Sequence, residues 1–319
     1  MNRIVLTGAA GFAGSHVLER FVAEFPDAEF IVLDKMTYAA HYDNIADVLH
    51  AHQAYLAVGD VCDLEFCLHW LEGADLVVHL AAESHVDRSF GNSRQFTVSN
   101  TLGTHTLLEA CRVQDVGRII HVSTDEVYGQ AIDGAFDEDS ILNPSNPYSA
   151  SKAGADMIVN SYIKSFDLPV QIVRANNLYG TRQFPEKIIP RFILNSLRGA
   201  RLPLHGDGLH LRNFLSVKDF ADALVTTLLK GQPQEIYNVC GTGEFSSIEI
   251  AEMICQAFGK TTQEVIEYVT DRPFNDKRYA VSAEKIQRLG WYPQRRLTDE
   301  LTPMIDWYRA NIDRYARVQ

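Results

Sequence analysis

The sequence predicts an α/β protein built on a doubly wound parallel sheet, with a smaller α/β lobe toward the C-terminus. Three observations predict this class. Continuously apolar short segments alternate with helical patterns through the first half of the 319 residues, as in parallel strands that are buried on both faces. A glycine-rich turn follows the first of these segments. Hydrophobic residues make up 46% of the chain, which is enough for a sizeable core.

The predicted strands are apolar runs that are separated by helical segments, an order typical of crossover connections between parallel strands. Strands are expected at 3–8, 30–34, 54–60, 75–82, 118–124, 170–175 and 235–240. Helices are expected at 14–24, 97–114, 148–166, 188–198 and 217–229.

The pattern changes after residue 178. Gly, Pro and Arg then occur at irregular spacing up to residue 213, and charged and aromatic residues are mixed through the last segment of the chain. We expect residues 1–178 to form the first domain, with 214–238 returning to it. Residues 179–213 and 239–319 are expected to form the smaller lobe, which would bind the substrate.

Composition excludes several classes of protein. The formal net charge of −12 argues against a nucleic-acid or anionic-membrane partner. The five cysteines are odd in number and contain no CxxC pair, which favours a reduced, cytoplasmic protein. No apolar run approaches a membrane span, and no signal-peptide pattern opens the sequence. His50 and His52 have no neighbouring cysteine or carboxylate cluster, so we expect no metal site.

The glycine-rich turn "TGAAGFAG" places Gly8, Gly11 and Gly14 between a strand and a helix. The first glycine permits the tight turn, the second allows a pyrophosphate to approach the backbone, and the third allows close helix–strand packing. Asp34 ends the next strand, 20 residues after Gly14. A carboxylate there can accept hydrogen bonds from both ribose hydroxyls and would repel a 2′-phosphate. The turn therefore predicts a Rossmann-type domain that binds NAD rather than NADP.

Two further residues near this turn allow alternative interpretations. Lys35 could cover the adenine of the cofactor, or it could be an ordinary exposed lysine. Asp60 follows the third predicted strand and could reach the adenine amino group, or it could cap the next helix.

Tyr148 and Lys152, in "YSASK", are four residues apart and lie on one face if the segment is helical. A nearby ammonium favours the phenolate, so we expect Lys152 to lower the pKa of Tyr148 toward neutral pH. Such a tyrosine can take a proton from a sugar hydroxyl. The spacing alone is common on amphipathic helices, so its weight depends on the neighbouring motifs.

The stretch "STDEVYG" delivers Thr124, Asp125 and Glu126 to the carboxyl end of the fifth strand, where a parallel sheet faces its ligand crevice. Adjacent strand residues point to opposite faces, so the two acids can share a pocket only if the strand has ended there. Gly129 supports that ending. The alternative is that Asp125 caps a turn and Glu126 is solvated.

Taken together, these motifs resemble the extended short-chain dehydrogenase/reductase family, and within it the nucleoside-diphosphate-glucose 4,6-dehydratases. "STDEVYG" is the most specific match, because related epimerases and decarboxylases generally lack the Asp-Glu couple. The other matching stretches are "TGAAGFAGSH", "LDKMTYA", "HLAAESHVDRS", "NPYSASK", "FPEKIIPRFI", "LPLHGDG", "LRNFLSVKD" and "DRPFNDKRYA".

This resemblance implies a reaction and a set of catalytic residues. NAD takes a hydride from C4 of the glucose, with Tyr148 as the base, Lys152 beside it and Thr124 holding the C4 oxygen. Glu126 then removes the C5 proton, Asp125 protonates the departing C6 hydroxyl, and the hydride returns to C6. The product is a 4-keto-6-deoxy sugar nucleotide.

The resemblance also implies binding residues. Ser84 would lie near the diphosphate and Arg212 would pair with phosphate, while Leu204 and His205 would border the base. The remaining substrate positions would be Asn177, Glu186, Lys187 and Arg272, together with Thr124. The cofactor positions would be Gly8, Gly11, Phe12, Ala13, Gly14, Asp34, Lys35, Thr37, Asp60, Val61, Leu80, Ala81, Ala82, Ser99, Tyr148 and Lys152. Helices 97–114 and 148–166 would form a homodimer interface.

Departures from the family pattern concern the substrate more than the chemistry. Leu178 stands where the thymidine-type enzymes have asparagine, and Phe274 and Asn275 stand where glycine and histidine are usual. "RANNLYG" and "LPLHGDG" are closer to the uridine-nucleotide branch. The resemblance therefore implies dTDP-glucose or UDP-glucose as the substrate. The alternatives are a sugar-nucleotide 4-epimerase or decarboxylase, or a non-catalytic NAD-binding regulatory protein.

Overall fold

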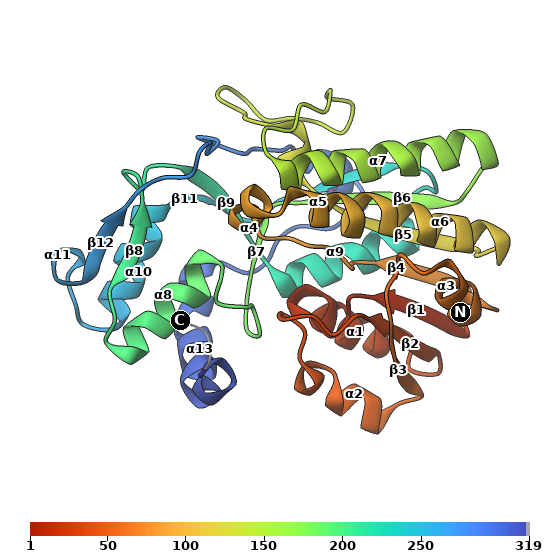
Figure 1. The fold of residues 1–319 in the computed structure, drawn as a ribbon, viewed down its shortest axis with the longest axis horizontal. Helices are drawn as coiled ribbons and strands as arrows, with labels where there is room; N and C mark the ends of the chain where they lie inside the picture. The colour runs from red at the N-terminus through yellow and green to blue at the C-terminus, as the bar shows by residue number, and fades with distance from the viewer. Residues whose placement is uncertain (317–319) are drawn as a thin grey trace.

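The computed structural model describes residues 1–316 and has a seven-stranded parallel sheet at its centre (Figure 1). The spatial order of the strands is β10-β6-β5-β4-β1-β2-β3. The strands are β1 (Arg3–Thr7), β2 (Glu29–Asp34), β3 (Ala54–Val58), β4 (Leu76–His79), β5 (Arg118–Thr124), β6 (Val170–Ala175) and β10 (Ile236–Val239). The chain winds outward from β1 to β3 and then in the other direction from β4, so a ligand crevice opens between β1 and β4. The predicted fold class is confirmed.

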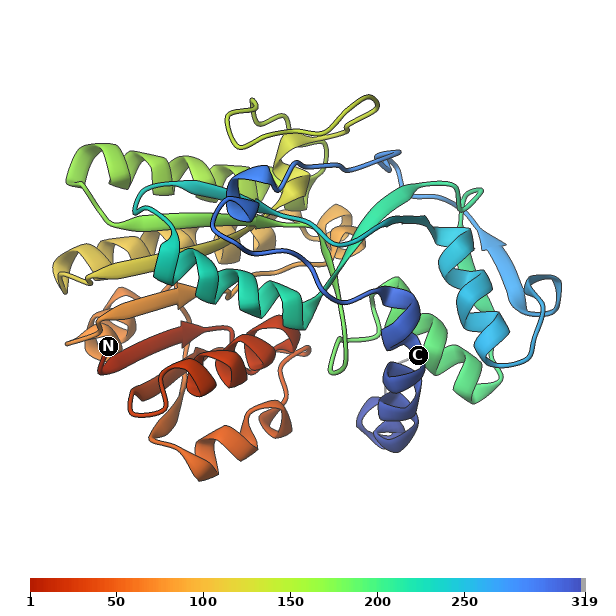
Figure 2. The same cartoon turned by 180° about the vertical axis from the view of Figure 1, so that it is seen from behind.

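Helices cover both faces of this sheet. Figure 2 shows α1 and α9 in front of it, and the helices α3, α6 and α7 pack on the opposite face. Each face has its own apolar core, because the strand residues alternate between the two layers: Leu6 and Val78 belong to one core, and Val5 and Val77 to the other. The helices are α1 (Phe12–Glu24), α2 (Ala46–Ala51), α3 (Leu64–Leu71), α6 (Gly103–Val113), α7 (Pro147–Phe166) and α9 (Val217–Lys230).

The segment predicted as one helix at 97–114 is divided. It begins with a π-helical turn, η2 (Thr97–Leu102), and continues as α6; two short helices, α4 (Val86–Gly91) and α5 (Ser93–Phe96), precede it. The wide turn contains the buried Asn100, whose side chain accepts from the Glu83 N–H and donates to its carbonyl. The turn is thereby tied to the loop after β4, a tertiary contact that periodicity cannot reveal.

Two predicted strands end two or more residues earlier than expected. β3 stops at Val58 and β4 at His79, whereas strands were predicted to continue to 60 and 82. The apolar residues Leu80, Ala81 and Ala82 leave the sheet at its carboxyl edge and line the crevice instead. An apolar run therefore continues beyond the strand because its last residues pack against a ligand pocket.

The smaller lobe lies at the left of Figure 1 and has a core of its own, which includes Phe192, Ile254 and Met304. One sheet contains β7 (Asn177–Tyr179), β9 (Leu211–Ser216) and β11 (Glu244–Ser246), and another contains β8 (Leu202–His205) and β12 (Ile266–Val269). The helices are α8 (Ile188–Arg198), α10 (Ser247–Ala257), α11 (Thr262–Val265) and α13 (Leu297–Ala310).

The chain crosses between the lobes more than once. β10 forms an edge of the large sheet, and α12 (Glu284–Gln287) packs against β10. Ile286 and Trp291 accordingly belong to the apolar core of the large sheet. The remaining short elements are η1 (Tyr42–Asn44), η3 (Asp125–Tyr128) and η4 (Ile312–Tyr315). Crossings at several points place residues from both lobes around one crevice.

Candidate active site

A cavity of about 450 Å³ opens at the carboxyl ends of the large sheet and extends to the smaller lobe. Every cofactor and substrate candidate named from the sequence lines it, and so do Thr124, Glu126, Tyr148 and Lys152. Asp125 is the exception, because its carboxyl group lies behind the cavity wall and contacts Thr124 and Asn176, which do line it. The structure thus brings the predicted residues together around one site.

The glycine turn fits a pyrophosphate. α1 begins at Phe12, and its N-cap residue is Gly11, which has no side chain to cap the first-turn N–H groups. These donors and the positive end of the helix dipole are available to an anion. A Cβ on Gly14 would lie 2.6 Å from Cα of Ala9 and closer still to the Gly8 carbonyl oxygen. Gly14 therefore allows the close packing of helix and turn that shapes this site.

Replacing Gly14 by Ala is expected to destabilise the protein by about 1–3 kcal/mol or more, because the added methyl group overlaps backbone that cannot move aside. Dinucleotide binding should weaken with it. Thermal unfolding and NAD titration measure the two effects. Gly91→Ala is the matched control, because a Cβ there would meet no atom within 4 Å. A Gly14→Ala protein that melts and binds like the parent would contradict this account.

Asp34 fits the ribose of an NAD molecule. Its side chain is buried, and its two carboxylate oxygens accept hydrogen bonds from the Ala10 N–H at 3.0 Å and the Met36 N–H at 2.8 Å. Burial raises the pKa of Asp34, and these two amides oppose the rise. Each oxygen keeps further capacity to accept a hydrogen bond, and Asp34 lines the cavity. A 2′-phosphate there would face a buried carboxylate.

Lys35 and Asp60 form an ion pair with each other. Lys35 Nζ lies 2.5 Å from Asp60 Oδ2, and Asp60 Oδ1 accepts from the Cys62 N–H. The following helix, α3, is capped by Asp63, which accepts from the Phe66 N–H. The helix-capping interpretation of Asp60 is therefore wrong, and both members of the pair line the cavity.

The tyrosine–lysine pair lies on α7. Asn146 caps this helix in a capping box with Ser149, so the pair follows directly after a fixed helix start. Lys152 Nζ donates to the Val122 carbonyl at 2.8 Å. Burial and the neighbouring Glu126 raise the pKa of Tyr148. The prediction that Lys152 lowers this pKa toward neutral pH is therefore wrong for the protein without bound ligands. Burial also lowers the pKa of Lys152 to about 8.

The two acids occupy η3, directly after the last residue of β5. Asp125 is 2% exposed and Glu126 is 8% exposed, so the interpretation of a solvated Glu126 is wrong. Asp125 accepts from the Thr124 hydroxyl at 3.1 Å and from the Asn176 side-chain amide. Glu126 accepts from the Asn146 amide at 3.4 Å.

Burial and the charge of Glu126 raise the pKa of Asp125 to about 7. Burial also raises the pKa of Glu126, against the opposing effect of Lys187 and Arg212. One carboxyl group of the pair can therefore hold a proton near neutral pH while the other accepts one. A site with both a proton donor and a proton acceptor can carry out an elimination.

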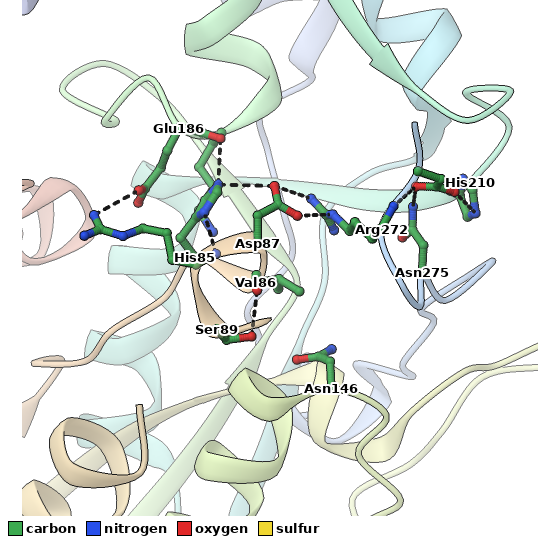
Figure 3. Close-up of polar contacts among 12 residues, drawn as sticks. His85, Val86, Asp87, Ser89, Asn146, Glu186, His210, Arg272 and Asn275 are labelled. Atoms are coloured by element: carbon green, nitrogen blue, oxygen red, sulfur yellow. Dashed lines mark hydrogen bonds and ion pairs between the residues drawn. The ribbon is translucent and has the colours of Figure 1, made fainter. Parts of the chain in front are cut away.

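Charged side chains of the smaller lobe contact residues of the large-sheet part where the cavity reaches the smaller lobe. Figure 3 shows Asp87, on α4, paired with Arg272, and it shows Glu186 beside His85. Lys187 Nζ donates to the Ser84 carbonyl at 2.6 Å. These contacts bring positive groups from the smaller lobe to the edge of the large sheet.

Arg212 approaches the same region from β9. Its guanidinium donates to Asn275 Oδ1 at 2.9 Å and lies 4.4 Å from the centre of the Tyr279 ring. Asn275 also donates to Asp271, which lies 3.7 Å from His210 (Figure 3). The planar guanidinium is held in place by these contacts and suits a phosphate group.

Sequence reasoning missed several groups at this site. Asn176 contacts Asp125, and Tyr279 lies 3.5 Å from Glu126 while donating to Asp276. Asn146 could have been found as the residue before a proline at a helix start. Tyr279 lies in the quoted stretch "DRPFNDKRYA", but nothing local predicts its contact with Glu126, because the two residues are 153 positions apart in the chain.

Residues 1–316 contain no helix that is both long and apolar enough to cross a membrane. In the same described range, no three or more His, Cys, Asp or Glu side chains are grouped so that they could hold a metal ion.

Comparisons with known proteins agree with this geometry. A family model described as GDP-mannose 4,6 dehydratase matches residues 5–304. A trifunctional UDP-glucose 4,6-dehydratase/3,5-epimerase/reductase of Arabidopsis thaliana is 44% identical over 97% of this chain, but the chain spans only 47% of that relative. A human dTDP-D-glucose 4,6-dehydratase is 40% identical over 100% of this chain and 93% of the relative.

A solved structure has nearly the same fold. The dTDP-glucose 4,6-dehydratase DesIV from Streptomyces venezuelae, with NAD and TYD bound, superposes with a TM-score of 0.96. It is 39% identical, and the match covers 99% of this chain and 100% of that one.

Proposed function

The chain belongs to the GDP-mannose 4,6 dehydratase family, and from this we propose that it converts a nucleoside-diphosphate glucose to the 4-keto-6-deoxy sugar with bound NAD. One observation favours a dehydratase over the alternative functions. Asp125 and Glu126 are buried together at the end of β5, beside Thr124, Tyr148 and Lys152. A simple oxidation or epimerisation at C4 requires no such pair of acids.

NAD, when bound, supplies the group that accepts a hydride from C4 and returns it to C6. The first-turn N–H groups of α1 would hold its pyrophosphate, and Asp34 its adenosine ribose. Tyr148 and Lys152 line the same cavity at the end of β5, where they would face the reacting sugar. NAD is regenerated in every cycle, so we expect it to stay with the protein like a prosthetic group.

In the first step Tyr148 takes the proton of the C4 hydroxyl while Thr124 holds the C4 oxygen. The raised pKa of Tyr148 means that its phenol gives up a proton only beside positive charge. Lys152, one turn further along α7, supplies such a charge.

In the second step Glu126 removes the C5 proton, which the 4-keto group has made acidic, and Asp125 protonates the C6 hydroxyl as it leaves. Asp125 has the pKa required of this acid, about 7. Its carboxyl group contacts the Thr124 hydroxyl at 3.1 Å, and so reaches the sugar once the substrate displaces that contact.

The nucleotide lies toward the smaller lobe in this proposal. Arg212 pairs with the diphosphate near Ser84. Asn177, Glu186 and Lys187 lie along the nucleotide sugar, and Arg272 lines the same cavity. Leu204 and His205 border the base, which is thymine or uracil. The relatives named above include dehydratases of both nucleotides, so the substrate is dTDP-glucose or UDP-glucose.

Incubation with dTDP-glucose and UDP-glucose in D₂O tests the proposal. A dehydratase gives a product that has lost one water and carries deuterium at C5. A 4-epimerase leaves C5 unlabelled and conserves the mass of the sugar. Binding of NAD with no turnover of either nucleotide would instead indicate a non-catalytic, regulatory protein.

We also propose a homodimer that forms through the segments 97–114 and 148–166. Leu102 in η2 and Met157 in α7 lie on neighbouring segments and are 48% and 52% exposed, so both apolar side chains are available for contact with a second copy of the chain. Sedimentation should give the mass of a dimer for the parent, and that of a monomer for Met157→Glu. A parent protein that sediments as a monomer at micromolar concentration would contradict the proposal.

The domain division and the cellular location are proposals as well. We assign 1–178 with 214–238 to the NAD-binding domain, and 179–213 with 239–319 to the substrate lobe. The separate apolar cores of the large sheet and of the smaller lobe support this division. The exceptions are Val239, which ends β10 of the large sheet, and α12, which returns to that sheet. Cysteine thiols, all unpaired among the described residues, support a reducing cytoplasm.

A further inference from the structure

A cluster of charged side chains is buried beneath the tyrosine–lysine pair, between α7 and the strands β5 and β6. Arg174 Nε donates to Asp156 Oδ2 at 2.9 Å, and His121 Nε2 lies 3.3 Å from Asp156 Oδ1. These three side chains are at most 2% exposed. Arg174 also donates to the Tyr128 hydroxyl at 2.6 Å. Buried charges are costly, so a cluster of this kind beneath a site requires an explanation.

The cluster is connected to Lys152 by two elements. Asp156 follows Lys152 by four residues in α7, so both side chains lie on the helix face that packs against the sheet. Lys152 Nζ donates to the carbonyl of Val122, the residue after His121 in β5. The lysine is therefore held between the helix that carries Asp156 and the strand that carries His121.

The titratable and charged groups around Lys152 come from four elements. Asp156 and Tyr148 lie on α7 with Lys152 itself, His121 lies on β5, and His79 lies on β4. Arg174 on β6 is bound to Asp156. Burial lowers the pKa of both histidines, so they are neutral near pH 7. Burial lowers the pKa of Lys152 to about 8, and Asp156 opposes that fall.

We propose that Asp156 is a positioning residue, whose buried carboxylate keeps Lys152 charged and oriented beneath Tyr148. The inference rests on the proposed function only for its catalytic consequence. The reaction would need Lys152 as a cation, and Asp156 is the anion that makes a cation stable at this depth in the protein. Arg174 and His121 hold the carboxylate in place, but neither touches the reacting groups.

Asp156→Asn tests the proposal, and Asp156→Asn/Arg174→Gln separates positioning from stability. The single variant leaves Arg174 buried without its anion and should unfold at a lower temperature. The double variant removes both charges and should recover much of that stability. In both variants Lys152 should lose its proton about one to three pH units lower than in the parent.

Two measurements report that shift. Lys152 lines the cavity, so the pH dependence of its acetylation by acetic anhydride, followed by peptide mass spectrometry, reports its protonation without substrate. If the pKa of Lys152 falls by one unit, the fraction of neutral amine at pH 7, and with it the labelling rate, should increase about tenfold at most. The alkaline limb of kcat should move to lower pH by the same amount.

Glu138→Gln is the matched control. Glu138 is a half-buried carboxylate that accepts from the Asn238 N–H at 2.8 Å. Asn238 Oδ1 accepts from the Tyr128 hydroxyl, so Glu138 lies at the far end of the network that contains Arg174. This variant should change stability without moving the labelling midpoint. The proposal is overturned if the midpoint in Asp156→Asn equals that of the parent, or if it returns to the parent value as stability returns in the double variant. Because labelling needs no turnover, a failure of the dehydratase assignment would appear separately, as absent activity in the parent.

Discussion

Replacing Glu126 by Gln is expected to stop dehydration while C4 oxidation continues. The amide cannot accept the C5 proton, so turnover should fall by about 10²- to 10⁴-fold. Tyr148 and Thr124, which act at C4, are unchanged. The substitution also keeps the size of a side chain that is 8% exposed and contacts Asn146, so the fold should be retained.

Quenching the Glu126→Gln reaction with borodeuteride checks this expectation. The trapped 4-keto glucose nucleotide should carry deuterium at C4, and substrate recovered from D₂O should carry none at C5. The Asp125→Asn protein is the comparison, because it should still exchange the C5 proton. If Glu126→Gln exchanges C5 at the parent rate, then Glu126 is not the base.

Replacing Asp125 by Asn is expected to abolish the loss of water while leaving C4 oxidation and C5 exchange intact. An amide has no proton to give to the departing C6 hydroxyl, so product formation should again fall by about 10²- to 10⁴-fold. The contacts that Asp125 makes with Thr124 and Asn176 are of a kind that an asparagine can largely replace.

The same substitution should stabilise the protein at higher pH. The pKa of Asp125 is raised to about 7 in the folded state, compared with about 4 in an unfolded chain. Between these values the folded state holds a proton that the unfolded state has lost, so stability falls as pH rises through this window. The asparagine side chain of the variant does not titrate. The free energy of unfolding of the variant, relative to that of the parent, should therefore increase from pH 4 to pH 7.

Urea unfolding of the parent and of Asp125→Asn at several pH values measures this difference. Equal pH dependence in the two proteins would show that Asp125 is ionised in the folded state at neutral pH. In that case the acid in the elimination is another group, and the division of roles between Asp125 and Glu126 would have to be reversed.

Local sequence was sufficient for the large sheet and for most of the cavity wall. The strands of the sheet are continuous apolar runs, and all parallel strands present their carboxyl ends at one edge. Residues that end a strand, such as Thr124 and Asp34, could therefore be assigned to the crevice from their position alone. The substrate-binding residues of the smaller lobe were predicted from the family motifs, because strand periodicity does not indicate which residues reach the cavity from that lobe.

The limits of this reasoning are visible at particular residues. The end of β4 was predicted three residues too late, because Leu80 to Ala82 are apolar for a reason other than strand pairing. The expected lowering of the Tyr148 pKa was wrong, because four-residue spacing says nothing about burial or about Glu126.

The sequence by itself determined the type of sheet, the edge where ligands bind and the residue types that reach that edge, since these follow from the periodicity of strands and the chirality of their connections. Only the tertiary structure decided which groups meet across long stretches of chain, as Tyr279 meets Glu126 and Arg174 meets Asp156. Burial at these contacts sets the protonation of each acid and base, and burial is a property of the packed molecule rather than of any segment of it.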